Sequence, residues 1–299
     1  MNIQPECYPC ILRQVNEAAQ KVGLQEDAQH EIMHSTMQYL LESPPDISPP
    51  EVGQAIHRLV REYSGNPDPY HREKAAHNDQ LLTLLPAIKS NVIRADDPLR
   101  MAVVYSIAGN VIDFGTATGP IDVEHELAQA LSTSFSIDHY DLFRDSLRQA
   151  KTLLILGDNA GEIVLDRLLV ETILDQYQVE ITYVVRGYPV LNDVTVTDAR
   201  QVGLHRVATI LSNGSDAPAT IMTEVSDPVR EQMNTADLII VKGQGNFESL
   251  SEISRPIYFF FKIKCQTVAC FIDAPMNSYV LGLNHRVHDR KEQYEYYAT

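Results

Sequence analysis

Positively charged residues are scarce in this chain of 299 residues. Its 24 lysines and arginines stand against 40 aspartates and glutamates, which gives a net charge of −16. A nucleic-acid-binding protein normally presents a basic face, and only short basic stretches such as residues 286–291 occur here. The composition therefore argues against nucleic acid as a partner. It is compatible with a small anionic ligand held by a few placed cations or by a metal ion.

Long hydrophobic runs are also missing. No apolar stretch approaches the ~20 residues that span a membrane. The opening residues, MNIQPECYPCILRQ, lack the basic and apolar segments of a signal peptide. Cysteine is scarce as well, and four cysteines in a cytosolic chain suggest thiols or metal ligands rather than structural disulfides. We therefore expect a cytoplasmic protein with no membrane partner, while the sequence carries no readable signal for its oligomeric state.

The first third of the chain has the periodicity of helices. Residues 11–22 group their apolar side chains on one face and end at Gly23, and residues 27–42 show the same spacing. Ser48 and Glu51 match a capping box, and Pro49 stands in the first helical turn, where proline is tolerated. We therefore expect a helical N-terminal region.

After residue 150 the pattern alternates between short strands and helices. Five β-prone runs are separated by helical patterns such as residues 162–177. The runs are 152–157, 181–187, 205–214, 236–245 and 256–265. This alternation is typical of a mostly parallel sheet covered on both faces. The predicted fold class is α/β, with a helical N-terminal region over residues 1–95 and a Rossmann-like, mostly parallel sheet in the domain over residues 96–299.

Polar residues gather directly after the predicted strands. In open parallel sheets, ligands bind beyond the carboxyl ends of the strands, so these residues are expected at one edge of the sheet. They are Asp158, Asn159 and Glu162 after the first strand, Arg186, Asn192 and Asp193 after the second, Lys242 and Asn246 after the fourth, and Lys262 and Lys264 on the fifth. Oxygen ligands and cations are thus predicted to converge.

Asp158, Asn159 and Asp193 each have an ordinary explanation as well. Aspartate and asparagine are favoured at helix N-termini, and all three residues stand shortly before possible helices. Together, however, two carboxylates and an amide on neighbouring loops supply hard oxygen ligands suited to Mg²⁺ or Mn²⁺. The combination predicts a divalent-metal site.

Two cations next to these loops point to an anionic ligand. Lys242 precedes the glycines of KGQGN, which expose backbone amides at a predicted strand-to-helix junction. Such a junction favours anions, and a lysine beside it is a good phosphate partner. Arg186 has two open interpretations, as a further anion partner or as one half of an ion pair on the surface.

The cysteines also allow two interpretations. Cys7 and Cys10 have the spacing of a metal or redox motif, whereas Cys265 and Cys270 are more widely spaced than the second pair of a usual zinc site. We expect Cys7 and Cys10 to pack near Cys265. Whether they form a metal-binding cluster or are simply buried thiols is left open by the sequence.

A series of longer motifs extends over most of the chain. CYPC, NPDPY, AGNVIDFG, GDNAGE, LNDVT followed by DA, and KGQGNFESL occur in this order. The series resembles the damage-control phosphatase family, long catalogued as domain of unknown function 89, and above all its microbial stand-alone branch. The resemblance extends from Cys7 to about Asp273. It implies a helical N-terminal region, a Rossmann-like domain and divalent-metal-dependent phosphatase activity on small phosphorylated metabolites.

Together with the strand-end positions, the resemblance implies roles for individual residues. The metal ligands would be Asp158, Asn159 and Asp193, holding Mn²⁺, Mg²⁺, Co²⁺ or Ni²⁺. The predicted catalytic residues are Asp158, Lys242 and Lys262, with Lys264 as the alternative register for the last. The predicted substrate-binding residues are Asn110, Asp113, Glu162 and Asn246. Sugar phosphates and related phosphomonoesters are the expected substrates.

Several alternatives are weighed against this hypothesis. A dinucleotide-dependent oxidoreductase is disfavoured, because GDNAGE places an acid where G-x-G-x-x-G would hold a pyrophosphate. A carboxyl methyltransferase on the same fold stays open, as does a non-catalytic protein that binds a phosphorylated metabolite. For the phosphatase itself, the absence of a D-x-D pattern favours attack by water over attack by Asp158.

Overall fold

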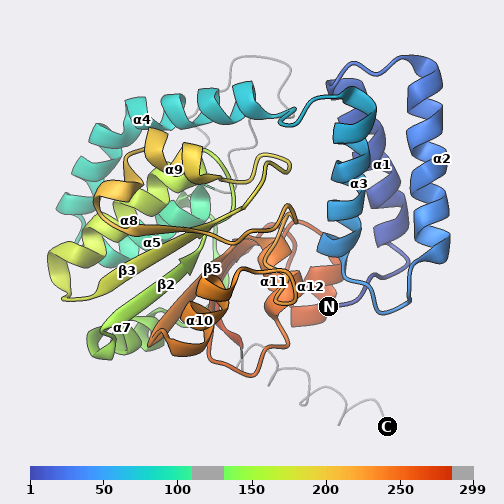
Figure 1. Ribbon diagram of the computed structural model, residues 1–299. Helices are drawn as coiled ribbons and strands as arrows, with labels where there is room; N and C mark the ends of the chain where they lie inside the picture. Colours follow the sequence, from blue (N-terminus) through green and yellow to red (C-terminus); the bar gives the residue numbers. More distant parts are fainter. Residues whose placement is uncertain (110–130, 285–299) are drawn as a thin grey trace, which may run out of the picture.

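A computed structural model of the chain describes residues 1–109 and 131–284. Figure 1 shows a twisted central sheet with helices on both faces, and a group of three helices formed by the N-terminal residues. Asn110 and Asp113, two of the predicted substrate-binding residues, lie outside the described ranges. Within the described part of the chain, no helix has both the length and the apolar character needed to cross a membrane.

Within the described residues, the central sheet has seven strands in the order β1-β7-β6-β5-β2-β3-β4. Neighbouring strands are parallel, except that β6 and β7 are antiparallel. The strands are β1 Phe135–Asp138, β2 Thr152–Leu156, β3 Glu180–Val185, β4 Thr209–Ser212, β5 Leu238–Lys242, β6 Tyr258–Lys262 and β7 Tyr279–Leu283. The five predicted strands correspond to β2 to β6, and the predicted α/β fold with a mostly parallel sheet is confirmed.

The sequence prediction misses β1 and β7 and makes some strands too long. Both missed strands are short, and β7 contains a glycine, which weakens a strand pattern. The predicted run 205–214 shrinks to β4, because a 3₁₀ turn at Leu204–Arg206 (η1) precedes it. The run 236–245 shrinks to β5, because the chain turns into a helix at Gly243.

Strands β2 and β5 form the centre of the sheet and pair with each other. Their sequences, TLLIL and LIIVK, are apolar at nearly every position, as expected for parallel strands covered by helices on both faces. All five residues of β5 are buried, including the charged Lys242 at its end. A buried ammonium group needs partners inside the protein, so the surroundings of Lys242 bear directly on the site.

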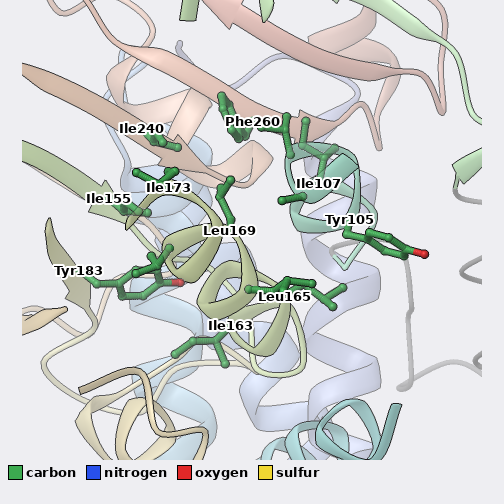
Figure 2. Packing of buried hydrophobic residues seen from close by; sticks show 14 of the residues in the cluster. Tyr105, Ile107, Ile155, Ile163, Leu165, Leu169, Ile173, Tyr183, Ile240 and Phe260 are labelled. Atoms are coloured by element: carbon green, nitrogen blue, oxygen red, sulfur yellow. The ribbon is translucent and has the colours of Figure 1, made fainter. Parts of the chain in front are cut away.

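Helices cover both faces of the sheet. The helices are α4 His71–Arg94, α5 Pro98–Ala108, α7 Tyr140–Gln149, α8 Glu162–Gln176, α9 Val196–Gln201, α10 Asp227–Thr235, α11 Gln244–Leu250 and α12 Gln266–Ile272. One hydrophobic cluster joins α4, α5, α7, α8 and α9 to the sheet, and a second joins α10, α11 and α12 to its other face. Figure 2 shows the first cluster, in which Leu165 and Leu169 of α8 pack among side chains of the sheet and of α5.

Three helices at the N-terminus have a hydrophobic cluster of their own. They are α1 Cys7–Lys21, α2 Glu26–Glu42 and α3 Pro49–Ser64. The predicted capping box at the start of α3 is confirmed, since the Ser48 amide donates to Glu51 Oε2 at 2.8 Å. Gly23, the predicted end of the first helix, has a positive φ of 72° just after α1.

Helix α4 packs with the sheet although it precedes residue 95. Its buried residues Leu81, Ile88 and Val92 belong to the cluster that contains β2 and α8. By packing, the separate helical unit is therefore α1 to α3, and α4 belongs to the α/β layer. Whether the chain divides into two domains at residue 95 stays a prediction.

Candidate active site

The carboxyl ends of β2, β3 and β5 meet at one edge of the sheet. From β2 the chain continues to β3 on one side, whereas β5 lies on the other side. A parallel sheet has a ligand-binding crevice at such a switch point. The loops after β2 and β3 carry the predicted metal ligands, and Lys242 is the last residue of β5.

The first loop leads from β2 into α8 and carries Asp158 and Asn159. The amide of Asn159 donates from Nδ2 to Asp158 Oδ2 at 2.8 Å. Gly243, after β5, approaches this loop so closely that a Cβ there would lie 2.1 Å from Asp158 Oδ2. Because Gly243 also has a φ of 83°, the position requires glycine for two independent reasons.

The second loop follows β3, carries Asp193 and is bonded to the first. Val194 donates from its backbone amide to the carbonyl of Asp158 at 2.9 Å, and Ala160 donates to the carbonyl of Asn192 at 2.8 Å. Asn159 and Asp193 also form a backbone bridge. The predicted trio Asp158, Asn159 and Asp193 is thus brought together by neighbouring loops.

Arg186 lies between the two carboxylates. Its Nε donates to Asp193 Oδ2 at 2.6 Å, and its Nη2 lies 3.6 Å from Asp158 Oδ1. The side chain is 1% exposed, so the interpretation as a surface ion pair is wrong. The sequence left this burial unread, because arginine is almost never fully buried unless it is paired.

The charge balance of this group suits a cation. Burial raises the pKa of Asp193 to about 7, and the nearby Asp158 carboxylate adds to the effect, while Arg186 opposes it. Two buried carboxylates therefore share one guanidinium, and a divalent cation would relieve their remaining repulsion. With Asn159 they offer the oxygen donors that Mg²⁺ and Mn²⁺ prefer, so the residues present fit the predicted metal.

Lys242 is directed away from open space into a buried network. Its Nζ lies 2.7 Å from the Ser106 carbonyl oxygen, 2.5 Å from Ser106 Oγ, and 2.8 Å from both Glu162 Oε1 and Asp166 Oδ1. Lys242 and Glu162 are both completely buried. The three hydrogens of the ammonium group are therefore already engaged by the protein.

The same network includes Glu162, in the first turn of α8 after the loop of Asp158, and Tyr183 of β3. Burial raises the pKa of Glu162 to about 8, with Asp166 and Asp158 adding to the effect and Lys242 opposing it. Tyr183 donates from its hydroxyl to Asp166 Oδ2 at 2.7 Å. Burial lowers the pKa of Lys242, but Asp166 and Glu162 outweigh it, so the lysine is held charged.

Comparison with known proteins shows the family of this chain. The family model described as the damage-control phosphatase ARMT1-like domain matches residues 3–280. The chain belongs to this family. An uncharacterized protein of Methanocaldococcus jannaschii is 37% identical over 290 residues, covering 94% of this chain and 95% of that protein. A protein of Archaeoglobus fulgidus named damage-control phosphatase is 36% identical over 275 residues, covering 90% and 94%.

A solved structure supports the same assignment. A protein of Pyrococcus horikoshii named damage-control phosphatase is 30% identical over 286 residues, covering 95% of this chain and 99% of that one. The crystal structure of the DUF89 family protein from the same organism superposes with a TM-score of 0.88 at the same coverage. These relatives are single chains of similar length, so the resemblance to the stand-alone branch is confirmed, and a phosphatase-type function is supported.

The remaining predicted residues occupy different positions around this edge of the sheet. Asn246 is completely buried and bonded on all sides: Nδ2 donates to the carbonyls of Lys242 and Gly157, and Oδ1 accepts from the Thr220 amide. Lys262 is half-buried at the end of β6, whereas Lys264 is exposed. Lys262 is therefore the one at the carboxyl end of its strand.

One contributor that the sequence analysis missed comes from α4. Asn78 is completely buried, and its Oδ1 accepts from the Gly161 amide at 2.7 Å. Its Nδ2 donates to Gln201 Oε1 at 2.9 Å, which connects the loop of Asp158 to α9. Asn78 could not be singled out from the sequence, because its burial depends on how α4 packs in the folded protein.

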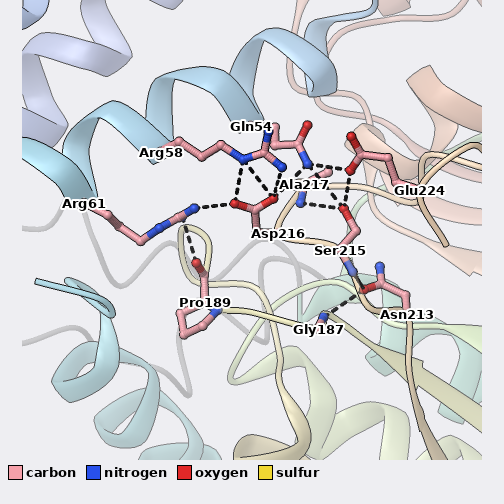
Figure 3. Close-up of polar contacts among 10 residues, drawn as sticks. All are labelled: Gln54, Arg58, Arg61, Gly187, Pro189, Asn213, Ser215, Asp216, Ala217 and Glu224. Carbon is pink, nitrogen blue, oxygen red and sulfur yellow. Dashed lines mark hydrogen bonds and ion pairs between the residues drawn. The ribbon is translucent and has the colours of Figure 1, made fainter. Parts of the chain in front are cut away.

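A cleft of about 750 Å³ lies next to the loop of Asp193. It is lined by α3 and by the loops after β3 and β4. In Figure 3, Arg58 and Arg61 of α3 both bind Asp216, and Arg61 also donates to the Pro189 carbonyl oxygen at 3.0 Å. Gln54 of α3 bonds to Asp216 as well, at 2.8 Å. The helical unit is thereby tied to the loop that carries Asp193.

The cysteines, all four of which lie in the described part of the chain, do not assemble into a metal site. Cys7 Sγ lies 4.0 Å from Thr267 Oγ1, and Cys265 caps α12 through a bond from the Val268 amide. All four are free thiols. Over residues 1–109 and 131–284, no three His, Cys, Asp or Glu side chains are grouped so as to hold a metal ion. The possible thiolate cluster is therefore wrong, whereas the trio at the sheet edge includes an amide and is not such a group.

Proposed function

We propose that this protein is a divalent-metal-dependent phosphatase that hydrolyses small phosphorylated metabolites. The observation that carries the proposal is the meeting of Asp158 and Asp193 at the switch point of the sheet, on two loops bonded to each other. Both carboxylates are buried, and Asn159 stands beside them. Membership in the damage-control phosphatase family supports the same reaction class.

Asp158, Asn159 and Asp193 would hold the cation. Mn²⁺, Mg²⁺, Co²⁺ and Ni²⁺ are the candidates, because oxygen donors with open positions suit small divalent ions. A bound divalent cation polarises a phosphoryl oxygen and helps to orient a water molecule. The protein contributes the fixed spacing of the loops, which removes the need to reorganise the ligands during the reaction.

The two lysines are assigned different roles in this proposal. Lys262, at the carboxyl end of β6, would offset charge on the phosphoryl group. Lys242 would act as a positioning residue, because its ammonium group is bound by Ser106, Glu162 and Asp166. By holding Glu162, it fixes the first turn of α8 directly behind the Asp158 loop.

The cleft beside Pro189 offers room for the part of the metabolite that carries the phosphate. Its lining includes arginine, carboxylate and serine side chains together with the exposed ring of Tyr188. Polar side chains of both signs suit a small hydroxylated compound such as a sugar phosphate.

The proposal is tested with metal-stripped protein and a panel of phosphorylated metabolites. Phosphate release should appear on addition of Mg²⁺, Mn²⁺, Co²⁺ or Ni²⁺ and should be abolished in Asp158→Ala. Asp145→Asn, which changes an exposed carboxylate on α7, serves as the matched control and should retain full activity. Phosphate release that resists exhaustive chelation would refute the metal-dependent reaction.

A further inference from the structure

The guanidinium group of Arg186 has unused hydrogen-bond donors. A guanidinium offers five N–H donors, and within the described residues only Nε makes a hydrogen bond, to Asp193. In that same part of the chain neither Nη1 nor Nη2 finds a hydrogen-bond partner, and both atoms are shielded from solvent. Nη2 is 3.6 Å from Asp158 Oδ1, beyond the usual hydrogen-bond distance.

Such a group is uncommon inside a protein and calls for a physical reason. Buried polar groups are almost always hydrogen-bonded, and a catalytic role or a bound water or ion is among the explanations for an exception. The unused donors belong to a side chain that already contacts both predicted metal-binding carboxylates. The missing acceptor is therefore expected at the metal site itself.

The acceptor can be identified by its chemistry. The planar fork of an arginine matches the oxygens of a carboxylate or a phosphate. The carboxylates of the site already face Nε and Nη2, and the proposed substrate brings phosphoryl oxygens. Two carboxylates, one guanidinium and a divalent cation also leave one positive charge, which favours a dianionic phosphomonoester.

We propose that Arg186 is a phosphoryl-binding residue, whose Nη1 and Nη2 donate to oxygens of the phosphoryl group held beside Asp158 and Asp193. This inference rests on the proposed function, because it assigns a role within the same site. It gives Arg186 the role that the sequence suggested for Lys242, whose donors are engaged by Ser106, Glu162 and Asp166.

A purely structural role predicts something different. If Arg186 only held the two carboxylates in place, its loss would weaken metal binding and leave the affinity for phosphate unchanged once metal is saturating. If Arg186 binds the phosphoryl group, the Arg186→Lys variant keeps the positive charge but loses the planar pair of N–H donors. Its affinity for phosphate should then fall even at saturating metal.

The experiment measures binding of inorganic phosphate to the Mn²⁺-loaded protein by calorimetry, which requires no turnover. We expect at least about a tenfold weaker Kd for phosphate in Arg186→Lys and in Arg186→Met, with kcat about a hundredfold lower on an active substrate. The control Arg167→Lys changes an arginine bound to Glu171 and to the Val202 carbonyl and should leave the Kd unaltered. Unchanged phosphate affinity in both Arg186 variants would overturn the inference.

Failure of the Arg186 inference can be distinguished from failure of the proposed phosphatase activity. A wild type that binds phosphate through Arg186 but releases none from any ester would refute the phosphatase and leave this inference standing. If both variants fail to fold, wild-type crystals soaked with Mn²⁺ and tungstate decide the question. An oxyanion within hydrogen-bond distance of the Arg186 Nη atoms supports the proposal, and an oxyanion bound elsewhere refutes it.

Discussion

The backbone amide of Val194 donates to the carbonyl oxygen of Asp158 at 2.9 Å, which joins the loop after β3 to the loop after β2. This bond joins the backbones of the two loops, and it brings Asp158 and Asp193 to one site although 35 positions of the chain separate them. Backbone bonds hold the two loops together, so changes to the carboxylates of Asp158 and Asp193 should alter metal binding without moving the loops.

Asp193→Asn should therefore weaken metal binding far more than Asp198→Asn. Asp193 faces Arg186 and Asp158, whereas Asp198 is the third residue of α9 and accepts from the amide and hydroxyl of its N-cap Thr195. We expect the affinity for Mn²⁺ to fall by about 10–100-fold or more in Asp193→Asn. Titration calorimetry measures both variants, and an equal loss in the two would contradict the assignment.

Lys242→Met should lower stability before anything else. Removing this ammonium group leaves Asp166 and Glu162 without their buried partner, and such losses commonly cost about 3–5 kcal/mol. Urea denaturation measures the free energy of unfolding. Adding Asp166→Asn should recover part of the loss, because it removes the uncompensated charge. Unaltered stability with a large loss of kcat would instead indicate that Lys242 contacts the substrate.

Gly243→Ala should displace Asp158 and weaken metal binding. The new Cβ would lie 2.1 Å from Asp158 Oδ2, and the residue would also be strained at a φ of 83°. Gly23→Ala is the matched control, since Gly23 has a φ of 72° but a methyl group there would meet no atom of the described residues within 4 Å. Both variants should lose about 1 kcal/mol or more of stability, but only Gly243→Ala should lose Mn²⁺ affinity. Similar Mn²⁺ affinity in the two variants would exclude the steric explanation.

The metal-free protein should become less stable as the pH rises. The pKa of Asp193 increases from 3.8 to about 7 on folding, and that of Glu162 increases from 4.5 to about 8. A carboxyl group with a raised pKa binds its proton more tightly in the folded state, so its stabilising contribution is present at acid pH. That contribution is lost as the pH rises through the folded pKa, between about pH 4 and pH 8.

Melting temperatures measured from pH 5 to pH 9 without metal test this dependence. Saturating Mn²⁺ should reduce the fall of the melting temperature with rising pH, because the cation stabilises the deprotonated form of Asp193. Glu162→Gln is the internal comparison and should flatten the decline, since an amide does not titrate. An identical slope in wild type and Glu162→Gln would show that Glu162 is not the group responsible.

Much of the fold followed from local patterns in the sequence. The apolar runs of β2 and β5, the helical periodicity of α8 and the capping box at Ser48 are decided by interactions within short segments. Residues that end parallel strands must meet at one edge, so Asp158 and Asp193 could be placed together before any contact was known. Strand β7 could not be predicted in this way, because it is defined by its antiparallel pairing with β6 and not by a local pattern.

The direction of the long cationic side chains was decided by packing. From the sequence, Lys242 and Arg186 are both cations at strand ends, and the lysine was the better phosphate partner. In the folded protein Ser106 of α5 and Asp166 of α8 surround the lysine. Arg186 lies between the two carboxylates, and its Nη1 and Nη2 have no hydrogen-bond partner among the described residues. A backbone pattern determines where a residue stands, but the end of a flexible side chain follows the charges that other elements bring to it, and those are set only when the helices and the sheet come together.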